Sequence, residues 1–322
     1  MRKIDLKNLL KKAGALRRPF HKNYYAMYSS VYGGIVTDPV LMMLPVDDHM
    51  VHRGDGIFEV FKCLNGNIYN LDAHFKRLER AASALKFRLP ASLKKIRTIV
   101  VETIQAGRHK DCYIHLYVSR GPGSFSVNPY DCPVPQLYVV VTRFSRPFME
   151  GHPEGARLRT SSIVAKTSFY AAVKSCNYLP NVLMKKEAVD LGVDFVVAFD
   201  EKGFLAEGAT ENVGIVTAKR ELLFPKLEGI LSGTTMMRVV ELAKKLVKTG
   251  GLTRVGFEDI SKRDVRNARE ILIVGTTPNV TMVKEFDGKA LGKGRAGSVY
   301  AKLSDLLLED MHNNKDVLTR VF

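Results

Sequence analysis

The sequence predicts a globular α/β protein in two domains, on three observations. Its 322 residues, 46% of them hydrophobic, are enough to bury one large core or two smaller ones. Short apolar runs bounded by turn residues alternate with amphipathic segments, so strands and helices are mixed along the chain. The segment SRPFMEGHPEGAR is rich in proline, glycine and charge and has no periodicity, which is typical of a linker. We therefore expect a basic extension over 1–22, an α+β domain over 23–145, a linker over 146–158 and a second domain over 159–322.

In the first domain the sequence predicts a hairpin, two helices and two further strands. The hairpin is GDGIFEVFKCLNGNIYNL, with Asn65-Gly66 at its tip. In DAHFKRLERAASALKF the apolar residues recur at helical spacing, and Asp72 is expected to be the N-cap. A second helix covers Ser92 to Gln105. The runs CYIHLYVSRG and QLYVVVTRF are expected strands, and the loop between them is too rich in glycine and proline to form an element.

The second domain is predicted to mix strands and helices. The expected strands are Arg157 to Ile163, Phe195 to Asp200, Val213 to Thr217 and Ile271 to Gly275. One helix is expected over Asn181 to Leu191, ended by Gly192, and another over Thr235 to Lys248, ended by Gly250 or Gly251.

The formal charge of +16 would attract nucleic acid, an anionic membrane or small phosphorylated and carboxylated ligands. The basic residues are spread among acidic ones, without an RNA-binding aromatic run or zinc-finger spacing. This distribution favours small anionic ligands over a nucleic-acid partner. The densest basic run, 2–22, is either an amphipathic helix or a transit-like extension, and Asp5 argues against the second.

Several other classes are disfavoured by composition. No apolar run reaches the roughly 18 residues of a membrane span, and the amino terminus has no signal-like apolar block, so we expect a cytoplasmic protein without a membrane partner. Four scattered cysteines without a CxxC pair indicate neither disulfides nor a metal site.

The stretch VKSCNYLPNVLMKKEAVDLG contains a candidate nucleophile. Lys174 ends an apolar segment just before a proline-interrupted turn and a helix. An amine in a desolvated or electropositive site has a lowered pKa, which lets it attack an aldehyde and later move a proton. Most of the 49 lysines and arginines must be surface charges, so a solvated Lys174 is the alternative.

The stretch GFLAEGATENVGIV places a carboxylate between two apolar strands. Glu207 there is costly to bury unless it is paired with a cation. A pyridinium nitrogen is such a cation, and a protonated ring is the electron sink that a pyridoxal enzyme needs. Tyr178, four residues after Lys174, can hydrogen-bond a ring oxygen. The alternative is that Glu207 is an ordinary turn residue bridged to a nearby lysine.

Two turns have the composition of an anion site. In EGILSGTTMMRVVELAKK, glycine, serine and threonine precede an amphipathic helix, so that N–H groups, hydroxyls and the positive helix end converge. A second Gly-Thr-Thr ends the strand REILIVGTT. The pair suits a phosphate and a carboxylate, although serine or threonine before a helix is also an ordinary N-cap.

Taken together and in this order, these motifs closely resemble the fold-type IV, or class IV, pyridoxal-phosphate family. The motifs are HRGDGIFEVFKCLNG, HFKRL, KSCNYLPN, AEGATENVGIV, GILSGTT and GTT. The likeness covers about residues 27 to 310, and the family includes branched-chain aminotransferases, D-amino-acid transaminases and aminodeoxychorismate lyases. The opening and the tail SDLLLEDM look most like the plant-type branch of lyases and D-amino-acid transaminases. The resemblance implies an N-terminal α+β sandwich, a barrel-like C-terminal domain, the cofactor pyridoxal 5′-phosphate, and a homodimer.

The resemblance also implies a role for individual residues. It makes Lys174 the Schiff-base lysine, Glu207 the partner of the pyridine nitrogen and Tyr178 the contact of the ring hydroxyl. Arg77 would grip the cofactor phosphate, with an exposed helix charge as the alternative. The remaining expected cofactor contacts are Asn212, Gly233, Thr234, Thr235 and Thr276. Thr277 falls where the substrate carboxylate is often held, or is a strand cap.

The chain departs from the family pattern around the substrate. Phe58 replaces the tyrosine that helps to bind carboxylate in bacterial D-alanine transaminases, and Phe125 with Val127 replace that enzyme's arginine and histidine. The groups left to bind the substrate carboxylate are Arg120, Arg143 or backbone groups. Gly214 stands where the family usually has an aromatic residue.

The resemblance implies transfer of an amino group between a D-amino or branched-chain amino acid and a 2-oxo acid. The alternative is cleavage of aminodeoxychorismate to 4-aminobenzoate and pyruvate, which uses the same residues. A third hypothesis, a nucleic-acid-binding protein without catalysis, is disfavoured because Lys174, Glu207 and Arg77 occur together.

Overall fold

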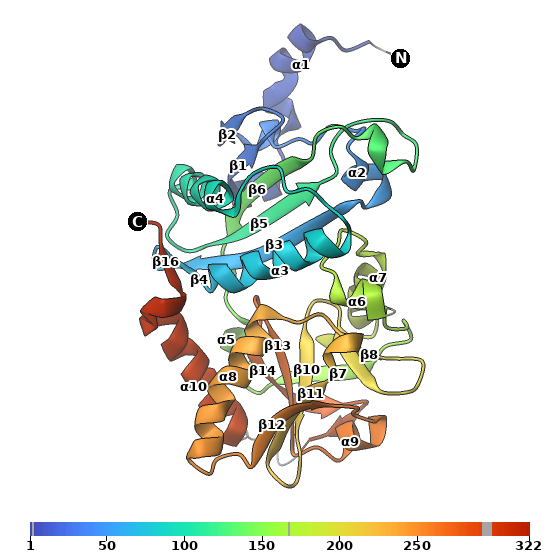
Figure 1. The fold of residues 1–322 in the computed structure, drawn as a ribbon, viewed down its shortest axis with the longest axis vertical. Helices are drawn as coiled ribbons and strands as arrows, with labels where there is room; N and C mark the ends of the chain where they lie inside the picture. Colours follow the sequence, from blue (N-terminus) through green and yellow to red (C-terminus); the bar gives the residue numbers. More distant parts are fainter. Residues whose placement is uncertain (2, 167, 292–297) are drawn as a thin grey trace. The chain divides into compact units, whose positions relative to one another are not determined.

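The computed structural model describes residues 1, 3–166, 168–291 and 298–322, which form two compact units (Figure 1). The first unit consists of Met1–Phe144 and Leu318–Phe322, and the second of Ser145–Val317. The segment expected to be a linker contains helix α5 (Phe148–Gly151) and the start of strand β7 (Ala156–Thr160). Ala156 and Leu158 lie in the core of the second unit, so this segment is part of that unit's fold.

The first unit is built on a seven-stranded antiparallel sheet with the order β16-β4-β3-β5-β6-β1-β2. Its hairpin turn is the expected one, because Asn65 and Gly66 have φ values of 49° and 78°, which a two-residue hairpin turn with both φ angles positive requires. The carboxyl-terminal strand of the chain completes one edge of the sheet, and this strand was not expected from the sequence. The strands are β1 (Tyr24–Ser29), β2 (Gly34–Val36), β3 (Gly56–Leu64), β4 (Asn67–Tyr69), β5 (Cys112–Ser119), β6 (Gln136–Arg143) and β16 (Leu318–Arg320).

Helices α3 (Leu71–Ala84) and α4 (Leu93–Gly107) pack on this sheet, α3 against β3 and α4 against β1 and β6. The expected start of α4 is confirmed, since the Ser92 hydroxyl accepts the Lys95 N–H at 3.3 Å. The expected N-cap of α3 is wrong. Asn70, in the left-handed region, precedes the helix, and Asp72 lies inside the first turn, where it pairs with Arg97. The shorter helices are α1 (Leu6–Lys12), α2 (His49–Arg53), η1 (Ala13–Leu16), η2 (Pro19–Asn23), η3 (Pro39–Leu41) and η4 (Pro129–Asp131).

In the second unit the strands close into a barrel of mixed direction. The path runs β10-β13-β14-β7-β8-β9 and returns to β10, while β11 and β12 extend from β10 and β15 pairs with β14. The pairs β14–β7, β7–β8 and β11–β12 are parallel and the others antiparallel. The strands after β7 are β8 (Phe195–Phe199), β9 (Leu205–Gly208), β10 (Asn212–Val216), β11 (Glu221–Pro225), β12 (Arg254–Glu258), β13 (Glu270–Gly275), β14 (Asn279–Phe286) and β15 (Lys289–Ala290).

The two expected helices of this unit are confirmed. Helix α7 (Leu179–Asp190) ends before Gly192 at φ 63°, and α8 (Thr234–Lys248) ends before Gly250 at φ 74°, both typical of a C-terminal glycine. The other helices are α6 (Ser168–Ala172), α9 (Lys262–Arg266), α10 (Ser298–Asn313), η5 (Leu227–Gly229) and η6 (Lys315–Val317). The two-domain α/β expectation, with an antiparallel sheet first and a barrel second, is therefore confirmed.

The structure also bears on the membrane expectation. None of the helices in residues 1, 3–166, 168–291 and 298–322 combines the length and the apolar character that a bilayer span needs.

The unusual glycine of β10 is explained by a ring from the neighbouring strand. A Cβ on Gly214 would lie only 2.6 Å from the ring of Phe224, which comes from β11 and is fully buried. Phe224 thus fills the space above Gly214, where the family usually has an aromatic residue. A ring occupies this part of the core, although it comes from a different position in the sequence.

We predict that Gly214→Ala lowers the free energy of unfolding by about 1–3 kcal/mol, because the added methyl group overpacks the core. Phe224→Leu in the same chain should recover part of that loss. Gly151→Ala is the matched control, since nothing lies within 4 Å of its Cβ position. Urea unfolding measures the free energy of unfolding of the three variants. A Gly214→Ala protein as stable as the wild type would contradict the packing account.

Candidate active site

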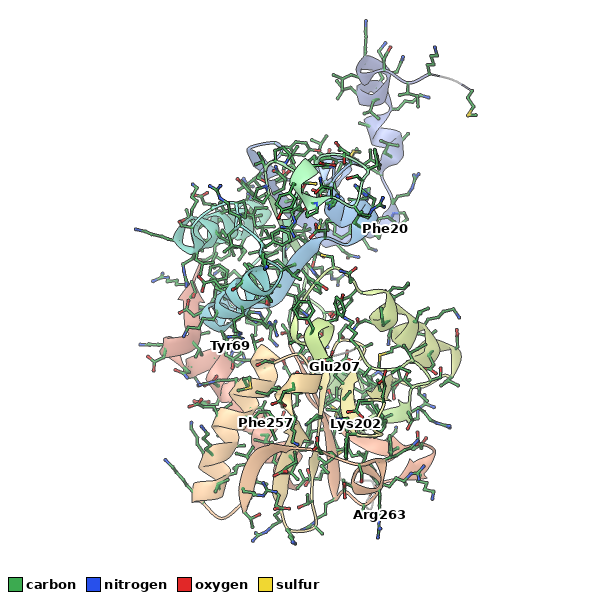
Figure 2. All side chains as sticks on the ribbon, turned by 45° about the vertical axis from the view of Figure 1, so that its right-hand side comes forward. Phe20, Tyr69, Lys202, Glu207, Phe257 and Arg263 are labelled. Atoms are coloured by element: carbon green, nitrogen blue, oxygen red, sulfur yellow. The ribbon has the colours of Figure 1, made fainter. Side chains whose placement is uncertain are left out.

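The turn between β9 and β10 places two of the expected site residues side by side. Glu207 and Asn212 are direct partners across the two strands, and the Gly208 N–H donates to the Glu211 carbonyl at 2.7 Å. The sequence AEGATEN folds this way because a short polar loop joins two apolar strands. Figure 2 labels Glu207 in the second unit.

Glu207 and Asn212 hold the same peptide segment from opposite ends. The Glu207 carboxylate accepts the Leu231 N–H at 3.0 Å, and the Asn212 amide donates to the Leu231 carbonyl at 2.9 Å. A Cβ on Gly233 would lie 2.0 Å from the Asn212 side-chain oxygen, so any other residue there would displace the Asn212 amide from Leu231. The start of α8 is thereby fixed next to Glu207.

The first turn of α8 has the features of an anion site. Gly233 is its N-cap and supplies no side-chain cap, while Thr234 and Thr235 follow it and are buried. The first N–H groups of a helix have no partner within the helix, and the helix dipole is positive at this end. The segment predicted from the sequence to be a phosphate turn is therefore built as a helix start beside Glu207.

Two lysines approach the Tyr178 ring. The Lys174 Nζ lies 5.7 Å from the ring centroid and the Lys166 Nζ lies 4.7 Å from it. Both lysines are half-buried. Lys174 and Tyr178 were predicted from the sequence, whereas Lys166 was missed, because no motif separates it from the other lysines.

The carboxylate of Glu207 is held in a poorly solvated place near these cations. Burial raises the pKa of Glu207 to about 7, although the Leu231 N–H and the charges of Lys166 and Lys174 act to lower it. Glu211 nearby acts in the same direction as burial. At neutral pH Glu207 is thus poised between its neutral and its anionic form, and a further cation would bind the anion.

The second Gly-Thr-Thr turn, 275–277, lies next to the turn between β9 and β10. Val274 is the partner of Asn212 across β13 and β10, and a Cβ on Gly275 would lie 3.7 Å from the Thr210 carbonyl oxygen. Thr276, half-buried, and Thr277, exposed, follow in the turn that leads to β14. The second unit therefore gathers Glu207, Asn212, the α8 start and the Thr276 turn at one end of its barrel strands.

Arg77 lies in the first unit and is already engaged by a carboxylate. Its Nε and Nη2 bond to Glu59 at 2.8 Å and 2.6 Å, and His74 Nδ1 lies 2.7 Å from the same carboxylate. Burial alone would raise the pKa of Glu59, but the charge and hydrogen bonds of Arg77, with those of His74, lower it to about 2. Arg77 is buried, which rules out the exposed helix charge that the sequence left open.

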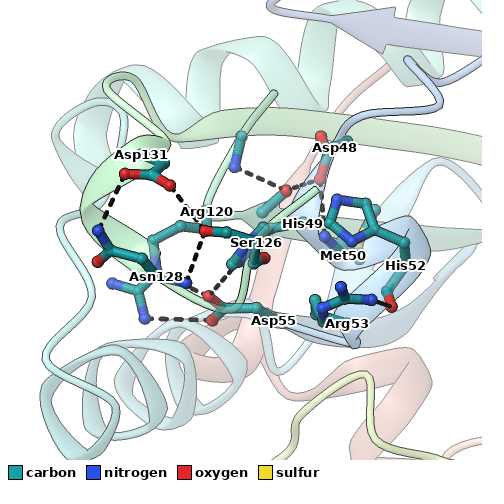
Figure 3. A network of polar contacts seen from close by, with 12 residues as sticks. Asp48, His49, Met50, His52, Arg53, Asp55, Arg120, Ser126, Asn128 and Asp131 are labelled. Carbon is teal, nitrogen blue, oxygen red and sulfur yellow. Dashed lines mark hydrogen bonds and ion pairs between the residues drawn. The ribbon is translucent and has the colours of Figure 1, made fainter. Parts of the chain in front are cut away.

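Arg120 and Phe58, also in the first unit, have partners there. Arg120 forms two hydrogen bonds to Asp55, at 3.0 Å and 3.1 Å (Figure 3). Its guanidinium lies 4.1 Å from the Phe87 ring centroid. These contacts anchor Arg120 at the start of the loop, and its expected contact with a substrate carboxylate stays a prediction. Phe58 stacks on Tyr117 with ring centroids 5.9 Å apart.

We predict that Glu207 makes the cofactor-free protein less stable as the pH rises from about 4.5 to about 7. Over that range the unfolded chain releases the Glu207 proton while the folded chain retains it, so the folded state loses free energy relative to the unfolded one. Above about pH 7 this contribution is constant. The total is at most about 3 kcal/mol.

Urea unfolding of the wild type and Glu207→Gln at several pH values measures this contribution as the difference between the two proteins. The free energy of unfolding of Glu207→Gln should exceed that of the wild type by an amount that grows up to about pH 7. Glu201→Gln, which changes an exposed residue, should show no such pH-dependent difference. A difference that does not change with pH would contradict the burial of an ionisable Glu207.

Comparison with known proteins identifies the family of this chain. The model of the amino-transferase class IV family matches residues 56–286. A chloroplastic D-amino-acid transaminase of Arabidopsis thaliana is 39% identical over 293 residues, which are 91% of this chain and 78% of that protein. A putative branched-chain-amino-acid aminotransferase of Methanocaldococcus jannaschii is 32% identical, covering 81% of this chain and 88% of that protein.

Solved structures agree on the fold. The T.th. branched-chain amino acid aminotransferase complexed with N-(5′-phosphopyridoxyl)-L-glutamate has a TM-score of 0.83 at 26% identity, covering 93% of this chain and 99% of that one. With the family model matched over more than half of its residues, this chain belongs to the class IV aminotransferase family.

Proposed function

We propose that this chain is a pyridoxal 5′-phosphate-dependent aminotransferase that moves an amino group between an amino acid and a 2-oxo acid. The observation that carries the proposal is the half-buried, poorly solvated Glu207 carboxylate, set beside Lys174, Tyr178 and the start of α8. Membership of the class IV family and the phosphopyridoxyl ligand of the T.th. relative support it.

The residues present fit this cofactor. A buried carboxylate with a pKa of about 7 needs a cationic partner to remain ionised, which a protonated pyridine ring provides. The α8 start, with a glycine that cannot carry a Cβ and two buried threonines, suits a phosphate. Asn212 acts indirectly, by holding the Leu231 carbonyl and closing on Gly233.

When bound, the cofactor supplies an electron sink through its protonated ring. Glu207 would keep the ring nitrogen protonated, and Tyr178 would donate to the ring oxygen. Lys174 is the amine that would hold the cofactor aldehyde, and the group that would take up the substrate α-proton and return it. Gly233, Thr234, Thr235 and Thr276 would hold the phosphate through N–H and hydroxyl groups.

Contributions from the first unit are part of the proposal. Arg77, whose guanidinium is bound on one edge by Glu59, is kept as a residue that would hold the cofactor phosphate. We keep Phe58 and Thr277 as the residues that would face the substrate. Arg120, two of whose nitrogens are bound to Asp55, is kept with them as a residue that would face the substrate, and backbone groups are the alternative for holding the substrate carboxylate.

The amino donor is a D-amino acid or a branched-chain amino acid in this proposal, in line with what the two relatives are named for. The same residues would serve cleavage of aminodeoxychorismate, so this alternative is an outcome of the assay below. We also propose a cytoplasmic location, which a fluorescent fusion would test against the chloroplastic one named for the Arabidopsis relative.

We predict that the purified protein shows a visible absorption band after addition of pyridoxal phosphate, and that one amino acid bleaches it. Lys174→Ala should lose both the band and activity, whereas Lys202→Ala, which removes an exposed lysine, should keep them. D-alanine, L-leucine and aminodeoxychorismate are added separately. Bleaching by one amino acid establishes transamination, release of pyruvate from aminodeoxychorismate establishes the lyase, and the absence of any band contradicts the proposal.

We further propose that the protein works as a homodimer through the loop between β5 and β6. Apolar side chains are exposed on this loop, among them Phe125 at 59%, Val127 at 78% and Tyr130 at 91%. The loop is nevertheless fixed, because Arg53 donates to the Phe125 carbonyl at 2.6 Å and His49 contacts the Ser126 carbonyl at 3.0 Å. Figure 3 labels Arg53, His49 and Ser126. A rigid loop with an exposed apolar surface is typical of an interaction site.

We predict that light scattering after size-exclusion chromatography gives twice the mass of one chain. Val127→Asp with Tyr130→Asp should shift the protein to the monomer, since it puts two charges into the proposed interface. Leu10→Asp is the matched control, an exposed leucine of α1 outside the loop. A wild-type protein that is monomeric at every concentration would contradict the proposal.

A further inference from the structure

We infer that the amino-terminal segment 3–22 binds an anionic lipid surface, on which helix α1 lies with its leucines inserted among the lipid headgroups. The inference goes beyond the proposed function and does not depend on it. It departs from the expectation of no membrane partner. That expectation rests on the length that a membrane span needs, which a helix lying on one face of a bilayer does not require.

Helix α1 has one apolar face and one basic face. Leu9 and Leu10 follow Leu6 at three and four positions, so the three leucines lie on one side of the helix. Lys7 and Lys11 are four positions apart and lie on the other side. An apolar stripe opposite a row of lysines is typical of a helix that lies in the plane of a membrane surface.

The apolar face of α1 is open to solvent. The exposed fractions of Leu6, Leu9 and Leu10 are 72%, 38% and 62%, and none of the residues of α1 is buried. Figure 1 shows α1 projecting from the rest of the first unit. Two further apolar side chains of the segment are also exposed, Ile4 at 61% and Phe20 at 52%. A group of exposed apolar side chains of this kind indicates an interaction surface.

The charge of the segment indicates the chemistry of the partner. Its only carboxylate is Asp5, which caps α1 by accepting the Asn8 N–H at 2.7 Å. Arg17 pairs with Asp38 at 2.7 Å. All the cations of the segment are exposed, and they are Lys3, Lys7, Lys11, Lys12, Arg17, Arg18 and Lys22. Anionic headgroups above an apolar layer are complementary to a surface that combines these cations with leucines.

Lipid fits the segment better than the other partners of a basic surface. Nucleic acid would engage the cations but would gain nothing from the three leucines. A second copy of this chain could cover the leucines, but each copy would bring the same positive charge to the contact, and like charges repel. An anionic lipid surface engages both faces of the helix.

The first test places a fluorescent reporter on each face of α1. The chain contains no tryptophan, so an introduced one is the sole reporter. The variants are Leu10→Trp, on the apolar face, and Lys11→Trp, the matched control on the basic face. The full-length protein as purified is mixed with vesicles of phosphatidylcholine, with or without phosphatidylserine. The emission of Leu10→Trp should move to shorter wavelength with the phosphatidylserine vesicles alone, and that of Lys11→Trp should not move.

The second test measures the contribution of the charges by sedimentation with the same vesicles. Lys7→Glu with Lys11→Glu should weaken binding at least about 25-fold, because each lysine near an anionic surface contributes about fivefold. Lys94→Glu with Lys95→Glu is the matched control. It makes the same change in net charge on two exposed lysines of α4 and should bind nearly as well as the wild type.

The contribution of the leucines is measured in the same way. Leu6→Ser with Leu10→Ser should weaken binding at least about tenfold, because apolar side chains that would leave water are removed. Val189→Ser with Leu191→Ser is the matched control, since these residues are 65% and 53% exposed at the end of α7. Both α1 double variants should unfold in urea like the wild type, because none of the residues of α1 is buried.

Three results would each overturn the inference. They are an unshifted Leu10→Trp emission, equal binding to both kinds of vesicle, and a loss of binding in Lys94→Glu with Lys95→Glu as large as that of the α1 charge reversal. A lower mass of Leu6→Ser with Leu10→Ser in light scattering would instead assign the leucines to a contact between copies. Binding to a DNA oligonucleotide without binding to vesicles would assign the cations to nucleic acid. None of these results depends on pyridoxal phosphate, so they are distinct from a failure of the proposed function.

Discussion

The candidate site depends on one partly buried contact, the hydrogen bond from the Leu231 N–H to the Glu207 carboxylate. With the bond from Asn212 to the Leu231 carbonyl, it fixes the segment that starts α8 against the β9–β10 turn. The same two side chains thereby place a carboxylate and a helix N-terminus next to each other. A ligand that joins a cationic ring to an anionic phosphate is complementary to that pair of features.

Two poorly solvated glutamates, the buried Glu59 and the half-buried Glu207, show how the same residue type is used in opposite ways. Glu59 is bound on both oxygens by Arg77 and contacts His74, and these partners lower its pKa to about 2 despite burial. Glu207 has one backbone donor and cations at a greater distance, and burial raises its pKa to about 7. Glu59, whose two oxygens are both hydrogen-bonded, fixes the position of Arg77. Glu207, whose charge is incompletely neutralised, can bind a further cation.

Much of this arrangement follows from local sequence signals. The Asn65-Gly66 hairpin, the Ser92 helix start and the glycines that end α7 and α8 each follow from steric or hydrogen-bonding needs of single residues. The closure of the barrel could not be predicted from such local signals, because β9 is short, contains a glycine and is defined by its partners β8 and β10. The carboxyl-terminal strand β16 was missed for the same reason, since its partner β4 is far away in the sequence.

The site residues divide in a similar way. Lys174, Tyr178, Glu207, Asn212 and the Gly233 turn were recognised because they occur in ordered motifs, and the structure gathers them in one unit. Lys166 has no motif, and Arg120 was selected without knowledge of Asp55, its partner across 65 positions. Charge partners of this kind are set by tertiary folding, so a residue list from sequence alone does not include them.

The most direct test of the central claim is to reduce the pyridoxal phosphate-loaded protein with borohydride and to map the modified peptide by mass spectrometry. The account predicts a single phosphopyridoxyl group on Lys174, in the peptide that contains Ser175 and Cys176. Modification of Lys166 instead, or of no single lysine, would contradict the assignment of Lys174 as the residue that holds the cofactor.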